Sequence, residues 1–169
     1  MNTNNVIRAL IGLLALCFAG LIVYSLRDTS AKEGQPAPQF SIKTDQGRTI
    51  SPNSFGGKVL VLNFWATWCP PCVQEVPSLN QFQREFAGQG VVVVAVSIDK
   101  NPQKYQAFLS KIPVVFQTAR DPNADVSSTY GTFQIPETYI IKDGRVARKF
   151  PEEENWTSDD ITQYVKSLL

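Results

Sequence analysis

Histidine is absent from all 169 residues of the chain. This absence excludes a Ser-His or Cys-His catalytic pair and any metal site with an imidazole ligand. Cysteine is scarce, since only Cys17, Cys69 and Cys72 occur, which is too few for a domain held together by disulfides. Charge is balanced as well, because 16 basic and 15 acidic residues leave a net charge of +1. We therefore expect no nucleic acid and no highly charged macromolecule as a partner.

An uncharged and almost wholly apolar run, ALIGLLALCFAGLIVYSL, covers residues 9–26. Its length is close to the roughly 20 residues that cross a bilayer, and it exceeds a typical signal-peptide core. We therefore expect a short N-terminal segment at residues 1–8, then a transmembrane anchor or uncleaved signal at residues 9–26. A polar linker over residues 27–34 would follow.

Two other interpretations of this run remain open. A cleaved signal peptide would use Thr29-Ser30-Ala31, which is a poor cleavage site. A lipoprotein signal would end at Cys17, but Leu16 rather than a small residue precedes that cysteine. The positive charges on the two flanks of the run are nearly equal, so they give only a slight preference for one orientation.

Residues 35–169 are enough for one ordinary domain with its own core. Apolar runs at residues 58–66 and 91–98 predict strands buried on both faces, and a helical stripe over residues 70–87 lies between them. This order predicts a βαβ unit. Pro77 lies inside the helical pattern, where we expect a kink. The other expected elements are hairpins at 40–50 and 138–150, helices at 102–111, 122–130 and 158–169, a strand at 113–116, and a solvated loop at 152–154.

Cys69 and Cys72 stand at the junction of the first predicted strand and the helix that follows it. A Cys-x-x-Cys pair in this position is typical of a dithiol/disulfide redox site. Unpaired N–H groups and the helix dipole stabilise a thiolate at a helix start, and the thiolate is the nucleophile in disulfide exchange. We therefore predict that Cys69, at the exposed end of the helix, attacks. Cys72, inside the first turn, would resolve the mixed disulfide.

Several motifs give the chain a resemblance to a known family. They are Phe64-Trp65-Ala66-Thr67-Trp68-Cys69-Pro70-Pro71-Cys72 with Glu75 and Pro77, then Ile135-Pro136-Glu137-Thr138-Tyr139, and the opening Gly34-Gln35-Pro36-Ala37-Pro38-Gln39-Phe40. With these motifs the chain resembles the membrane-anchored, extracytoplasmic ResA/TlpA/CcmG(DsbE)-like thiol-disulfide oxidoreductases. The resemblance implies an α/β thioredoxin fold, in which helices flank a mixed central sheet, with an N-terminal β-hairpin and a central insertion near residues 101–119.

The resemblance also implies a substrate site around the Cys69-Cys72 disulfide. Pro136 would be a cis-proline that faces the disulfide, and the backbone of Ile135 would pair with the substrate chain. The other expected substrate-binding residues are Trp68, Pro70, Pro71 and Glu137. We expect no cofactor and no metal.

Asn63 departs from cytoplasmic-type thioredoxins, which have a buried aspartate at the matching position. An asparagine cannot take the proton of the resolving thiol, whereas Glu75, about one helical turn past Cys72, can. The resemblance implies that Glu75 tunes the cysteines, although the residue pattern alone also fits an exposed helix glutamate. Glu137 would place a second carboxylate nearby. Because a negative neighbour raises the pKa of a thiol, we predict a reductant.

The resemblance further implies oxidised extracytoplasmic protein thiols as substrates, apocytochrome c among them, and a membrane thiol carrier as the source of electrons. The implied location is the bacterial inner (cytoplasmic) membrane, with a single pass and the domain on the periplasmic side. The client stays open. ResA- and CcmG-like proteins reduce apocytochrome c, whereas TlpA-like proteins serve other oxidised thiols, including those of copper-site proteins.

Two functions other than that of a reductant remain as alternatives. A peroxiredoxin-like antioxidant enzyme would need a Pro-x-x-x-Thr-x-x-Cys signature, but this chain has Leu62 and Ala66 at the proline and threonine positions. A copper-binding or redox-inactive thioredoxin-fold module is the second, although Sco-like copper proteins require a histidine. The two cysteines can also be read as a structural disulfide or as part of a zinc site, which usually needs further ligands.

Overall fold

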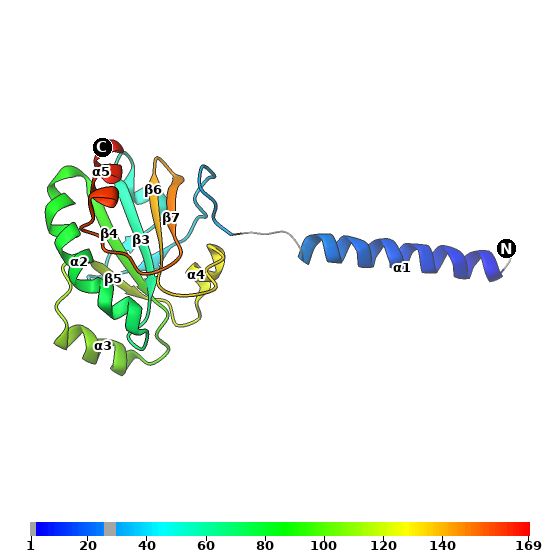
Figure 1. Ribbon diagram of the computed structural model, residues 1–169. Coiled ribbons are helices and arrows are strands. Elements are labelled where there is room, and N and C mark those ends of the chain that lie inside the picture. The colour runs from blue at the N-terminus through cyan, green and yellow to red at the C-terminus, as the bar shows by residue number, and fades with distance from the viewer. Residues whose placement is uncertain (1–2, 26–29) are drawn as a thin grey trace.

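The computed structural model describes residues 3–25 and 30–169. Helix α1 (Thr3–Ser25) projects away from a folded unit that contains all the other elements (Figure 1). Within the described ranges, no helix has both the length and the hydropathy that a membrane crossing requires. The expected anchor ends at Leu26, which lies outside the described residues, as do residues 27–29 of the expected linker.

A mixed sheet of five strands forms the centre of the folded unit, in the order β5-β4-β3-β6-β7. Strands β3, β4 and β5 are parallel, whereas β6 runs antiparallel to β3, and β7 runs antiparallel to β6. Every residue of β3 is buried, as the continuous apolar run predicted. The bounds are β3 Val59–Trp65, β4 Val91–Ser97, β5 Gln117–Arg120, β6 Glu137–Lys142 and β7 Arg145–Phe150.

Alternate residues of β3 point to opposite faces of the sheet and so build two cores. Val59, Val61 and Trp65 pack on the face covered by α2, α3 and α5 (Figure 1). Leu60 and Leu62 pack on the opposite face, which residues 31–55 and α4 cover. The covering elements are α2 Pro70–Phe86, η2 Ala87–Gln89, α3 Pro102–Lys111, α5 Asp159–Ser167, β1 Ile42–Lys43, β2 Thr49–Ile50, η1 Pro52–Phe55 and α4 Asp125–Thr129.

Most of the predicted elements are confirmed within one or two residues. Helix α2 is continuous through Pro77, and α3 has the predicted bounds. Both hairpins form, although β1 and β2 are short. The helix predicted over residues 122–130 is shorter, since only α4 at its centre is helical.

The strand predicted at residues 113–116 is wrong, because β5 begins only at Gln117. The side chain of Asn80 on α2 takes the place of a neighbouring strand. Its amide donates to the carbonyl of Pro113 at 2.8 Å and accepts from the N–H of Val115 at 2.8 Å. The backbone of this segment is therefore satisfied by a helix side chain and does not enter the sheet.

The second half of the expected linker packs against the folded unit. Ala31 is buried and its N–H donates to Tyr130. The N–H of Gly34 donates to the carbonyl of Val146, and the carboxylate of Glu33 accepts from the N–H of Lys149. The contacts of the folded unit therefore extend toward the N-terminus beyond the expected boundary at residue 35.

Candidate active site

The redox pair lies where the central strand β3 gives way to helix α2. Cys69 and Cys72 form a disulfide, with their Cα atoms 5.3 Å apart. Cys69 is the N-cap of α2, and the backbone N–H of Cys72 donates to its Sγ at 3.3 Å. Pro70 and Pro71 fill the first two helical positions, where a missing N–H leaves no helical bond unmade. A helix N–H therefore points at the sulfur of Cys69, where it would favour a thiolate.

Cys69 is less exposed than its place at the helix start suggested. It is 5% exposed, against 1% for Cys72, so both cysteines are buried and the expected difference in access is small. Trp68, directly before the pair, is 64% exposed. Apolar surface therefore lies next to a disulfide that is itself almost covered.

A cis peptide bond joins Ile135 and Pro136, as the resemblance implied. The carbonyl oxygen of Ile135 lies 3.6 Å from the Sγ of Cys69. The loop that precedes β6 is thus in direct contact with the sulfur that is predicted to attack.

Glu75 is buried behind the pair, one turn further along α2, and Asn63 of β3 holds its carboxylate. The amide Nδ2 of Asn63 donates to Glu75 Oε1 at 2.6 Å and to Thr138 Oγ1 of β6 at 2.9 Å. Glu75 is only 4% exposed, so it is not the exposed helix glutamate that the residue pattern also allowed. The asparagine that cannot accept a proton positions the glutamate that can.

Two further donors reach Glu75 from the segment after β7. The indole Nε1 of Trp156 and the backbone N–H of Glu154 donate to Oε2 at 3.3 and 3.4 Å. Burial raises the pKa of Glu75 to about 7, although the hydrogen bonds from Asn63, Trp156 and Glu154 oppose this rise. The group therefore titrates near neutral pH, which is the range required of a proton carrier.

The strand register places the side chain of Glu137 on the other face of the sheet from Glu75. In the β3–β6 register, Asn63 is opposite Thr138 and Phe64 is opposite Glu137. Neighbouring residues along a strand point to opposite faces. The carboxylate of Glu137 therefore turns away from Asn63 and Glu75.

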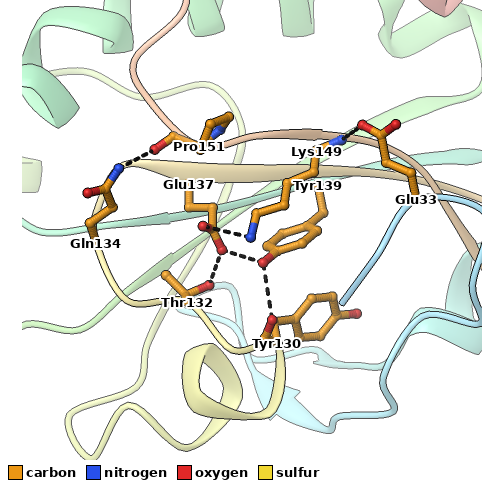
Figure 2. Close-up of polar contacts among 8 residues, drawn as sticks. All are labelled: Glu33, Tyr130, Thr132, Gln134, Glu137, Tyr139, Lys149 and Pro151. Atoms are coloured by element: carbon orange, nitrogen blue, oxygen red, sulfur yellow. Dashed lines mark hydrogen bonds and ion pairs between the residues drawn. The ribbon is translucent and has the colours of Figure 1, made fainter. Parts of the chain in front are cut away.

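The partners of Glu137 form a compact polar group (Figure 2). Thr132 donates to Oε1 at 2.7 Å, Lys149 pairs with Oε2 at 3.0 Å, and the hydroxyl of Tyr139 donates to Oε1. Within residues 30–169, no hydrogen bond or ion pair joins Glu137 to either cysteine. The structure therefore does not bring Glu137 together with the disulfide, and its expected part in substrate binding stays a prediction.

Asp99, which the sequence analysis missed, supports the loop before Cys69. Its carboxylate accepts from the N–H and the hydroxyl of Thr67 at 2.8 and 2.7 Å, and from the hydroxyl of Ser97 at 2.6 Å. The end of β4 thereby fixes the turn that carries the redox pair. No local signal identifies this contact, because 32 residues separate Thr67 from Asp99.

Phe133 was missed as well. It is 96% exposed and lies three residues before the cis-proline. Single exposed hydrophobic side chains are common on protein surfaces, so its position next to the cis-proline loop is what makes Phe133 a candidate contact. The only sequence signal is its place beside the Ile135-Pro136 motif.

Across the parts of the chain that the structure describes, no three Cys, Asp or Glu side chains gather closely enough to hold a metal ion. The hydroxyl that a peroxiredoxin signature would supply is also missing, since Leu62 and Ala66 are buried hydrocarbon side chains. The site thus consists of a disulfide, a cis-proline loop and the buried carboxylate of Glu75, with Asp99 supporting the turn before Cys69. Together with the mixed sheet, these features define a thioredoxin-like thiol-disulfide oxidoreductase.

Comparison with known proteins agrees with this class. The chain matches the AhpC/TSA family over residues 33–149. It is 30% identical over 173 residues to the thiol-disulfide oxidoreductase ResA of Bacillus thuringiensis subsp. konkukian (strain 97-27), with 99% of each chain covered. It is 38% identical over 121 residues to the thioredoxin-like protein YneN of Bacillus subtilis (strain 168), with 70% of each covered.

A solved structure supports the same assignment. The chain superimposes with a TM-score of 0.76 on a Chlorobium tepidum protein assigned as a thiol:disulfide interchange protein DsbE, at 29% identity, covering 82% of this chain and 99% of the other. The chain therefore belongs to the AhpC/TSA family and, within it, to the ResA-like thiol-disulfide oxidoreductases. It is a redox enzyme with a thioredoxin-like fold, and its substrates are protein thiols.

Proposed function

We propose that the enzyme works as a reductant of disulfides in extracytoplasmic proteins, with Cys69 as nucleophile and Cys72 as resolving thiol. The observation that carries this proposal is the buried carboxylate of Glu75, one helical turn from Cys72, with no basic side chain paired to it among the described residues. A negative charge near a thiol raises the pKa of the thiol. A dithiol whose thiolates are poorly stabilised gives up its electrons readily, since a stabilised reduced form is what makes a strong oxidant.

The reaction would proceed in two exchanges. The Cys69 thiolate attacks one sulfur of the substrate disulfide, an S–S bond forms between them, and the other substrate sulfur leaves as a thiolate. Cys72 then loses its proton and attacks Cys69. The Cys69–Cys72 disulfide forms, and the first substrate sulfur is released. Two electrons pass from the enzyme dithiol to the substrate, which takes up two protons as its thiols form.

Glu75 would accept the proton that Cys72 releases. With a pKa raised to about 7 by burial, the carboxylate is partly ionised at neutral pH and can both take and return a proton. Asn63 would act as a positioning residue, since it holds Oε1 and cannot itself titrate.

Substrate would dock over the exposed residues that surround the disulfide. The backbone of Ile135, in contact with Cys69, would pair with the substrate chain. Trp68 and Phe133, both exposed, would pack on its side chains, and Pro70 and Pro71 would contact it at the start of α2. Glu137 would act indirectly, by fixing Thr132 in the loop that leads to Pro136.

We place the domain on the periplasmic side of the bacterial inner membrane, held there by the apolar residues 9–26. The composition of that run supports this part of the proposal. The reductant would be a membrane thiol carrier, and apocytochrome c is the client that the ResA-like relationship favours. Sedimentation of the full chain with membranes after an alkaline wash would test the anchor, since loss of residues 1–29 should release the domain.

Trapping identifies the client. Replacing Cys72 with serine removes the resolving thiol, so we expect the mixed disulfide on Cys69 to persist and substrate proteins to remain attached. Cys69→Ser is the matched control and should trap nothing. Apocytochrome c among the adducts supports cytochrome maturation, whereas capture of other proteins alone rejects that client.

The reduction potential tests the direction of electron flow. We expect a value well below that of a strong oxidant such as DsbA, at about −120 mV. Equilibration of the full chain with glutathione buffers, read by tryptophan fluorescence, measures it. A potential near the DsbA value would contradict the assignment as a reductant.

A further inference from the structure

A cleft of about 490 Å³ opens beside the redox pair, where β4 ends and α3 begins. Trp68 lines it, and this residue directly precedes Cys69. The remaining lining comes from residues 98–101, from Lys104 in the first turn of α3, and from residues 122–124. The cleft therefore begins one residue from the sulfur that attacks the substrate.

The exposed charged side chains that line the cleft are positive. Lys100 and Lys104 both line it, both are exposed, and neither forms an ion pair with any residue in the described part of the chain. Arg120 does not line the cleft, but it adds a third positive charge to the loop of residues 99 and 100, since its guanidinium donates to the carbonyls of Asp99 and Lys100 at 3.2 Å. Three basic groups thus surround one loop beside the active site.

Two of the carboxylates near the cleft face inward. Asp99 lines the cleft but is buried, and its oxygens accept from Thr67 and Ser97. Asp121 is buried as well, and it accepts from the N–H groups of residues 125 and 126. Asp99 and Asp121 are thus occupied with internal donors. Asp125 is exposed, but it does not line the cleft, and within the described residues no ion pair joins it to Lys100 or Lys104.

Trp68 gives the cleft an apolar wall. Its indole is 64% exposed, next to the two lysines, so a bound segment would meet hydrophobic and cationic surface together. This combination suits a polypeptide with an acidic side chain beside apolar ones, because opposite charges attract across an interface and set both the rate of encounter and the register.

We propose that the cleft binds the substrate polypeptide next to its reacting cysteine and selects an aspartate or glutamate within a few residues of that cysteine. This inference rests on the proposed function, because it requires a protein disulfide as substrate. Lys100 and Lys104 are specificity residues in this scheme and take no part in the exchange of sulfur bonds.

The test uses the full chain in detergent micelles, reduced, with three peptides that contain the same intramolecular disulfide. The residues flanking the disulfide are glutamate, glutamine or lysine. Second-order rate constants from tryptophan fluorescence are divided by the rate of each peptide with dithiothreitol, which removes differences in intrinsic reactivity. We expect the glutamate peptide to react about three- to tenfold faster than the glutamine peptide and the lysine peptide to be slowest. High salt should shrink the difference.

Lys100→Glu/Lys104→Glu should reverse the order of the peptides. The matched control is Lys43→Glu/Lys111→Glu, which changes the net charge equally at two exposed lysines outside the cleft. The control should keep the preference for glutamate.

Equal normalised rates for the three peptides would overturn the inference while leaving the proposed function intact. Loss of the preference in the control variant to the same extent would also overturn it, because the effect would then come from net charge. If no peptide is reduced, the proposed function fails, and the cleft inference fails with it.

Discussion

The carboxylate of Glu75 has three hydrogen-bond donors around it and, among residues 30–169, no basic side chain paired with it. The donors favour the ionised form of Glu75, whereas burial disfavours it. Burial has the larger effect, so the pKa of Glu75 rises to about 7. In a cytoplasmic-type thioredoxin one buried aspartate would supply both the position and the proton. Here Asn63 supplies the position and Glu75 the titrating group.

This pKa makes stability depend on pH. Between the ordinary value of 4.5 and about 7, the folded protein binds more protons at Glu75 than the unfolded chain does, so the free energy of unfolding falls as pH rises through this window. The difference corresponds to about 3 kcal/mol between pH 4 and pH 8. Urea unfolding of the oxidised protein at several pH values should show the fall in the wild type and lack this component in Glu75→Gln.

Glu152→Gln provides the comparison, because Glu152 is exposed and its loss should leave the pH profile nearly unchanged. The expected result is a difference in slope, so a uniform loss of stability in Glu75→Gln does not obscure it. Identical pH profiles for wild type and Glu75→Gln would contradict the role of burial at this residue.

At the scale of secondary-structure elements, prediction succeeded where the signals are local. Helix α3 begins as expected because Asn101 accepts from the N–H of Lys104 and Pro102 occupies the first position. The β6–β7 hairpin turns at Asp143 and Gly144, both at positive φ, a conformation that the Asp-Gly pair favours. The start of α3 and the position of the hairpin turn thus depend on residues that are close to each other in the sequence.

Prediction failed where the partner is distant. Asn80 holds the backbone of Pro113 and Val115 across more than thirty residues, and nothing local distinguishes that arrangement from strand pairing.

The residues of the active site likewise divide into those with a local sequence signal and those without one. The cysteines and Glu75 belong to one short motif, whereas Trp156 comes from 81 residues away. Glu137 was expected near the cysteines from the family resemblance. The strand register, which turns its side chain away from Asn63 and Glu75, is set only in the folded sheet.

Asn80 therefore provides a test at this scale. Asn80→Ala removes one donor and one acceptor and should lower the free energy of unfolding by about 1–3 kcal/mol. The amide of Val115 should also lose its protection from hydrogen exchange. Gln81→Ala, an exposed neighbour on α2, should cost little. Unchanged protection at Val115 in Asn80→Ala would contradict the account of residues 113–116.

At the scale of the whole molecule, residues 31–34 belong to the folded unit. A chain that starts at Ser30 keeps the bonds of Ala31, Glu33 and Gly34 to the sheet and to α4. One that starts at Gln35 loses at least five hydrogen bonds, including that from the N–H of Gln35 to the carbonyl of Lys32, and the buried side chain of Ala31. We expect the shorter chain to be less stable by about 2–4 kcal/mol in urea unfolding. Equal midpoints would place the boundary at residue 35 after all.

If residues 9–26 hold the enzyme in a membrane, as proposed above, the packing of Ala31 sets how far the domain can lie from that membrane. Helix α1 ends at Ser25, so the chain between that residue and Ala31 can reach at most about 20 Å. With residues 9–26 in a bilayer, the redox pair would stay within the length of this tether plus the width of the domain from the lipid surface. Substrate proteins would be reduced only within this distance of the membrane. The rate of reduction would depend on how often they meet the enzyme there. Newly exported chains, which emerge at that surface, would then meet the dithiol ahead of proteins that have already diffused away.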